Sequence, residues 1–145
     1  MVYRDPIDPD RAILVVGING MVYGLDRVTG ATRWSNVLSY GGHGEVFVAW
    51  RHDVLVVSAD ANQVYRLDPL TGDTRWRAPT SGEGRATIVI EPDCIVVGKG
   101  SRIDCFDLDG HRLWSRAVSG GGKGHWRAAL GFPGNVAQAD EPGSS

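Results

Sequence analysis

The sequence predicts an all-β protein built from a repeated unit of about 40 residues. Three glycine-rich tetrapeptides, GGHG, SGEG and GGKG, begin at Gly41, Ser81 and Gly121, so the interval is 40 residues both times. Between them lie short runs rich in Val, Ile and Tyr and bounded by Gly, Asn and Asp, which is the pattern of strands and turns. No long stretch keeps an uninterrupted helical period, so we expect almost no helix.

Each repeat has the same order of strands and turns. A β-branched run, a turn, a second run that ends in aspartate, another turn and a tryptophan follow one another in segments 13–38, 54–80 and 94–118. A further strand is expected after each glycine-rich loop, at 45–50, 85–90 and 125–130. Four short antiparallel strands in a unit of this length are typical of a β-propeller blade. A β-sandwich is the alternative fold, but it requires neither near-identical turns nor a tryptophan at a fixed position in each repeat.

The turns carry recognisable turn chemistry. Asn19-Gly20 is the strongest hairpin signal in the chain, because both central residues of a type I′ turn need positive φ. Gly30, Gly72 and Gly110 supply the positive-φ residue of the turn before each tryptophan. The glycine-rich loops are expected to carry the chain from the outer strand of one blade to the inner strand of the next, where glycine tolerates a sharp turn.

These elements define the predicted organisation of the chain. We predict an all-β propeller with four-stranded antiparallel blades, three per chain, preceded by an N-terminal extension at 1–10. The predicted blades cover 11–44, 45–84 and 85–124, and an inner strand at 125–130 and a flexible tail at 131–145 follow them.

The turn that precedes each tryptophan also carries a family resemblance. The pattern L-D-x-x-T-G-x-x-x-W occurs at 25–34 and 67–76, and the third copy, at 106–114, lacks one residue and the threonine. Over roughly 11–130 the chain resembles the PQQ-type (quinoprotein-like) propeller repeat. The resemblance implies that the tryptophans dock between neighbouring blades. The candidate blade-docking residues are Trp34, Trp76, Trp114, Asp26, Asp68 and Asp107.

The first and last strands suggest how a ring is completed. The segment Asp5–Pro9 holds two prolines and cannot form a central strand, so the first blade is expected to lack its inner strand. Because an open stack of blades leaves two apolar faces exposed, we expect the strand at 125–130 to complete the first blade of a second copy. This predicts a six-bladed homodimer about a two-fold axis, and a nine-bladed trimer fits less well. The candidate closure residues are Trp126, Ala128, Leu130, Ile13 and Val15.

Composition and charge exclude several classes of function. The formal net charge is −2, so no general affinity for nucleic acid or anionic membranes is expected. The chain has no apolar run of membrane-spanning length, and its first ten residues contain no signal-peptide core. The two cysteines, Cys94 and Cys105, fit a reducing compartment as small buried residues, and a cross-strand disulfide is the alternative. We therefore expect a cytoplasmic protein.

No catalytic, cofactor-binding or metal-ligating residue emerges from the sequence, and no cofactor is predicted. Quinoprotein dehydrogenases of the resembling family hold their cofactor with adjacent cysteines, which this chain does not have. Glu45, Arg85 and His125 recur at the starts of inner strands, where they line either a hydrated channel mouth or a small ligand site. We expect a non-catalytic, homo-oligomeric scaffold for protein–protein interaction. The alternatives are a lectin-like or quinone- and metal-binding propeller, or a fragment of a larger quinoprotein-like propeller.

Overall fold

The computed structural model describes residues 9–118 and 128–138, and in this part the chain forms antiparallel sheets with one short 3-10 helix, η1 (Pro9–Ala12). Sheet 1 consists of β1 (Ile13–Ile18), β2 (Met21–Asp26) and β3 (Thr32–Val37). Sheet 2 consists of β4 (Val46–Arg51), β5 (Val54–Ala59), β6 (Gln63–Leu67) and β7 (Thr74–Pro79). Sheet 3 consists of β8 (Ala86–Ile90), β9 (Ile95–Lys99), β10 (Arg102–Phe106) and β11 (Arg112–Ala117). The C-terminal hairpin consists of β12 (Leu130–Phe132) and β13 (Asn135–Ala137).

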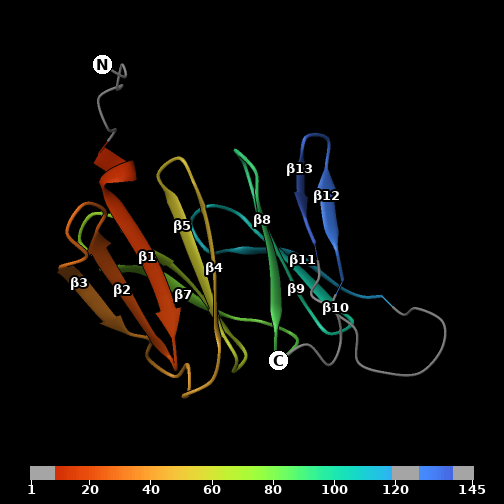
Figure 1. Cartoon of the computed structure of the whole chain (residues 1–145). Coiled ribbons are helices and arrows are strands. Elements are labelled where there is room, and N and C mark those ends of the chain that lie inside the picture. Colours follow the sequence, from red (N-terminus) through yellow and green to blue (C-terminus); the bar gives the residue numbers. More distant parts are fainter. Residues whose placement is uncertain (1–8, 119–127, 139–145) are drawn as a thin grey trace.

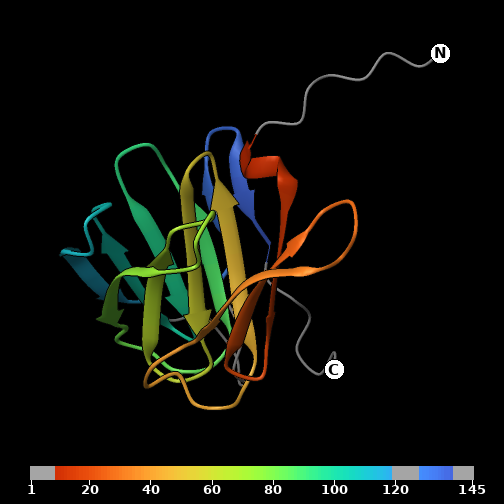
Figure 2. The same ribbon diagram turned by 90° about the vertical axis from the view of Figure 1, so that its left-hand side faces the viewer.

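Every sheet follows the order of its strands in the sequence, and the sheets stand side by side in chain order from sheet 1 to the C-terminal hairpin (Figures 1 and 2). This confirms the prediction of four-stranded antiparallel units with almost no helix. Sheet 1 has three strands within the described residues, and its β1 corresponds to the second strand of sheets 2 and 3. None of the described helical residues forms a span long and apolar enough to cross a membrane.

The predicted turns are present with the expected backbone geometry. Asn19 and Gly20 have φ values of 48° and 75°, as a type I′ hairpin between β1 and β2 requires. Gly30, Gly72 and Gly110 all have positive φ. A register shift recurs at the same point of the three sheets, where the third strand of the repeat meets its outer strand. The bulge increases the local twist of each sheet edge.

Two of the glycine-rich loops lie where the sequence predicts. They join β3 to β4 and β7 to β8, and Gly42 and Gly84 adopt φ values of 75° and 91°. The Gly84 N–H donates to the Asp60 carbonyl at 2.8 Å, which ties the second loop to a hairpin of sheet 2. The third loop lies outside the described residues.

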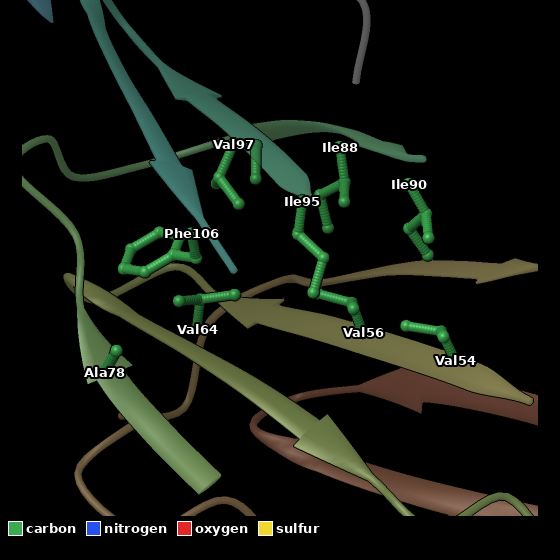
Figure 3. Packing of buried hydrophobic residues seen from close by; sticks show 10 residues of the cluster. Val54, Val56, Val64, Ala78, Ile88, Ile90, Ile95, Val97 and Phe106 are labelled. Carbon is green, nitrogen blue, oxygen red and sulfur yellow. The ribbon is translucent and has the colours of Figure 1, made fainter. Parts of the chain in front are cut away.

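Apolar side chains between the sheets form the core. β5 has six buried residues, because one face packs on sheet 1 and the other on sheet 3. Val54 and Val56 face sheet 3 (Figure 3), whereas Leu55 and Val57 face sheet 1. A strand covered on both faces reads as a continuous apolar run, which explains the VLVVSA sequence of β5.

The C-terminal hairpin corrects one sequence expectation. The sequence predicts a flexible tail at 131–145, and this is wrong for 131–137, where β12 pairs with β13 across a turn with Gly134 at φ 73°. The physical reason is packing on sheet 3, because Leu130 and Phe132 contact a cluster of Val96, Ile103 and Cys105. The predicted inner strand at 125–130 overlaps β12 only at Leu130, and residues 125–127 lie outside the described part of the chain.

Candidate functional site

A tryptophan docks sheet 1 onto sheet 2. Trp34, on β3, is 7% exposed, and its indole N–H donates to the Pro69 carbonyl at 2.9 Å. The ring lies between Gly24 of its own sheet and Gly72 of the next, and a Cβ at either glycine would overlap it. The docking contact therefore needs a glycine and a free carbonyl in the receiving turn.

The same contact recurs between sheets 2 and 3. The indole N–H of Trp76 donates to the Leu108 carbonyl at 2.8 Å, and a Cβ at Gly110 would lie 2.6 Å from the ring. The Arg66 guanidinium donates to the same carbonyl at 2.9 Å. Two equivalent docking contacts within one chain show that the geometry belongs to the repeat.

The predicted aspartates hold the receiving turns rather than the tryptophans. Asp68 Oδ1 accepts backbone hydrogen bonds from Leu70 at 2.9 Å and from Thr71 at 3.2 Å. Asp26 and Asp107 cap their own turns in the same way. Backbone hydrogen bonds to the ionised carboxylate are the main cause that lowers the pKa of all three aspartates below the usual value.

The docking contact is unfilled at both ends of the stack of sheets. Trp114, on β11, is 48% exposed, and within the described residues its indole N–H has no hydrogen-bond partner. At the other end, no atom of residues 9–118 or 128–138 lies within 4 Å of a Cβ built on Gly30. Of the predicted docking residues, Trp34 and Trp76 are therefore engaged within the chain, and Trp114 has no such contact in the part of the chain that the structure describes.

Sheet 1 also has an unpacked apolar face. Leu14 and Ile18 are 56% and 53% exposed, because alternate residues of β1 point away from sheet 2. Two of the predicted closure residues, Ile13 and Val15, instead pack in the cluster between sheets 1 and 2. Among the described residues, sheet 1 therefore leaves the Leu14 and Ile18 face exposed and one backbone edge of β1 without a neighbouring strand.

The remaining predicted closure residues lie at the other end of the chain. Ala128 and Leu130 pack beside the Val96, Ile103 and Cys105 cluster of sheet 3, and Leu130 pairs with Ala137 of the same chain. Trp126 lies outside the described residues. The pairing of this segment with a second copy stays a prediction.

Two of the predicted channel-mouth residues form an ion pair. A guanidinium nitrogen of Arg85, just before β8, lies 3.3 Å from Oε1 of Glu45, just before β4. Both side chains are partly exposed, so the pair contributes little to stability. The pair links the starts of two inner strands, and opposite charges there neutralise each other. His125 lies outside the described residues, and the channel mouth itself stays a prediction.

A buried lysine between sheets 2 and 3 was not predicted from the sequence. Lys99 is 1% exposed, and its Nζ donates to the carbonyls of Ala59 at 2.7 Å and Ala61 at 2.6 Å. Burial lowers the pKa of Lys99 to about 8, against the opposing effect of nearby carboxylates such as Asp60 and Asp104. One signal was available, since Lys99 aligns in its repeat with the small apolar Ala59.

The two cysteines have no reactive environment. Cys94 and Cys105 are free thiols, and burial raises the pKa of Cys94 to about 12. A thiol with such a pKa is a poor nucleophile at neutral pH. In the described ranges no group of three or more His, Cys, Asp and Glu side chains is arranged to hold a metal ion.

Comparison with known proteins identifies the repeat. The sequence model of one protein family, described as outer membrane protein assembly factor BamB, matches residues 4–134. The chain belongs to this PQQ-type propeller family. The crystal structure of BamB from Moraxella catarrhalis superimposes with a TM-score of 0.66 at 20% identity, over 90% of this chain and 44% of that chain. No curated protein matches the sequence.

A second structural neighbour belongs to a different functional class. A europium-containing methanol dehydrogenase superimposes with a TM-score of 0.55 at 18% identity, over 75% of this chain and 23% of that chain. At these identities the likeness establishes the propeller fold alone. The chain spans less than half the length of either neighbour. The four-stranded antiparallel sheets 2 and 3 are consistent with propeller blades.

Proposed function

We propose that the protein is a non-catalytic β-propeller scaffold for protein–protein interaction that acts as a homo-oligomer. The observation that carries the proposal is the half-exposed Trp114, a docking residue whose two counterparts are filled within the chain. An exposed tryptophan beside apolar surface favours association with another protein surface. The family model describes an assembly factor, which supports an interaction role for this chain.

A homodimer is the favoured oligomer. Two copies would match about nine-tenths of the BamB chain, of which one copy matches 44%. In the proposed ring, the C-terminal segment of each copy supplies the inner strand that sheet 1 of the other copy does not have among the described residues. The C-terminal hairpin offers two strands where only one is needed, so one of them leaves its position on docking. Its strands have three residues each, and few backbone hydrogen bonds are exchanged.

Absolute mass in solution tests the oligomer. Light scattering on a sizing column is expected to give twice the chain mass of 15.6 kDa, with dissociation on dilution. A folded monomer at every concentration up to the millimolar range would overturn the proposal. Far-UV circular dichroism on the same fractions distinguishes a folded monomer from an unfolded chain.

A quinone-dependent enzyme is the second candidate function, favoured by the likeness to methanol dehydrogenase. Activity assays with added quinone and calcium across alcohol substrates test it, and no turnover is expected.

A ligand-binding propeller would instead give heat in calorimetry with glycans or metal ions, at a stoichiometry near three per chain if each blade carried a site. Either positive result would replace the scaffold proposal.

A further inference from the structure

We propose that Trp114 of one copy docks head-to-tail into the turn Asp26–Gly30 of a second copy, with the contacts that Trp34 and Trp76 make within the chain. The inference rests on the proposed self-association and specifies its geometry. It assigns a donor surface to sheet 3 and an acceptor surface to sheet 1. The two surfaces are different, so the interface is heterologous.

The donor side matches the two filled contacts in strand register. Trp34 pairs with Gly24 and Trp76 pairs with Arg66, and each points at the following sheet. Trp114 pairs with Cys105, which is the equivalent position of sheet 3. The indole of Trp114 therefore leaves its sheet on the same face as the other two. The C-terminal hairpin packs on the Val96, Ile103 and Cys105 part of this face and leaves Trp114 half-exposed.

The acceptor side matches the two filled turns. The carbonyls that receive an indole N–H belong to Pro69 and Leu108, each of which directly follows the capping aspartate. Arg27 has this position in sheet 1, and no hydrogen bond to its carbonyl occurs among the described residues. Gly30 has φ 76°, close to the 79° of Gly72, and the space above it is open. The turn is thus shaped to receive an indole before any partner arrives.

A second polar contact supports the same alignment. Beside Trp34, the Asn36 amide donates to the Gly72 carbonyl at 2.7 Å and to Thr74 Oγ1 at 3.0 Å. In sheet 3 the position of Asn36 holds Arg116, whose side chain is exposed. In sheet 1 the position of Thr74 holds Thr32, which is also exposed. A guanidinium donates as an amide does, so Arg116 can bind the Gly30 carbonyl and Thr32.

Exposed apolar surface on sheet 1 adds to the contact. Leu14, Ile18 and Val37 are exposed on the face of sheet 1 that points away from sheet 2. Docking of this face onto sheet 3 would bury it, and apolar burial contributes roughly 25 cal/mol for each Å². A head-to-tail contact closes into a two-fold ring when both ends of both copies engage. The second copy therefore satisfies both unfilled ends at once.

Cross-linking between two variants, each with one added cysteine, tests the alignment. R116C and T32C chains are mixed and treated with a short bifunctional maleimide, and a cross-linked dimer is expected in the mixture well above the level of either variant alone. The matched control replaces T32C with T74C, because Thr74 is the equivalent residue of a turn that Trp34 already fills. That mixture is expected to give only the background from Cys94 and Cys105.

The dissociation constant measured by dilution gives a second readout. W114A is expected to weaken self-association at least tenfold, since a docked tryptophan is a typical binding hot spot. L113A, on the opposite face of the same strand and similarly exposed, is expected to change it less than threefold. A dimer that persists in W114A and gives no specific cross-link would refute the head-to-tail contact and leave the scaffold proposal standing. A monomeric wild-type protein would refute both.

Discussion

Replacing Trp34 with alanine removes the docking contact between sheets 1 and 2, and we expect it to lower the free energy of unfolding by about 3–5 kcal/mol. The side chain is 7% exposed, lies between Gly24 and Gly72, and donates a buried hydrogen bond to Pro69. Truncation leaves a cavity of nearly the whole indole and an unpaired carbonyl. W114A, measured below the concentration of self-association, is the matched control and should cost much less, because Trp114 is half-exposed.

The second arm of the experiment is Gly72→Ala, alone and combined with W34A. Alanine at φ 79° costs about 1–2 kcal/mol in either background. With Trp34 present, the new methyl group also overlaps the indole ring, and such overpacking adds about 1–3 kcal/mol. The overlap disappears in W34A. The double-mutant cycle should therefore show a coupling free energy of about 1–3 kcal/mol.

Urea denaturation followed by far-UV circular dichroism measures the free energy of unfolding of the wild type and of each variant, because the backbone signal of the strands remains when a tryptophan is removed. Additive effects within about 0.5 kcal/mol would refute the contact between Trp34 and Gly72. An equal loss in W34A and W114A would refute the distinction between filled and unfilled docking contacts.

Three further predictions concern titratable groups. Because the pKa of Lys99 is lowered to about 8, the unfolded chain binds more protons than the folded one between pH 8 and about 10.5. The free energy of unfolding of the wild type relative to K99M should therefore rise with pH across this window. A constant difference would show that Lys99 is not buried. Backbone hydrogen bonds in its turn lower the pKa of Asp68, so D68A should reduce the melting temperature at pH 7 more than D73A does. This difference should vanish as the pH falls below the pKa of Asp68. Equal melting temperatures of the two variants at pH 7 would count against the capping role. Cys94, with its pKa raised to about 12, should react with thiol reagents at pH 8 far more slowly than a free cysteine does, and rapid labelling of the native protein would show that its burial is incomplete.

Turns and strands could be predicted from the sequence because their causes are local. Asn19-Gly20 forms a type I′ turn from its own backbone preference, and Gly30 and Gly72 adopt positive φ for the same reason. The strand repeat then fixed the fold class, since four such strands recur at a constant interval. The family profile supports the resemblance that the tryptophan motif implied.

The missed features depend on contacts between distant residues. β13 is only three residues long, and it forms because Asn135 donates to the Ile90 carbonyl at 2.7 Å and because β12 packs on sheet 3. The burial of Lys99 depends on two carbonyl acceptors, at Ala59 and Ala61, which lie about 40 residues earlier in the chain. The local sequence of a strand does not indicate which distant residues will provide its hydrogen-bond partners. Whether a docking tryptophan is filled likewise depends on what lies opposite it, which the motif around each tryptophan does not show.

The docking contact between a tryptophan and a receiving turn does not by itself determine which two sheets pack together. Its acceptor is a backbone carbonyl beside a glycine, so any receiving turn of the repeat can take any docking tryptophan. The side chains that differ are those beside the tryptophan, namely Asn36, Ala78 and Arg116 in the three sheets. Within the chain, covalent connection selects the neighbour, and Ala78 needs no polar partner. In the proposed contact between copies no such connection exists, and a charged donor at Arg116 would supply the additional selectivity.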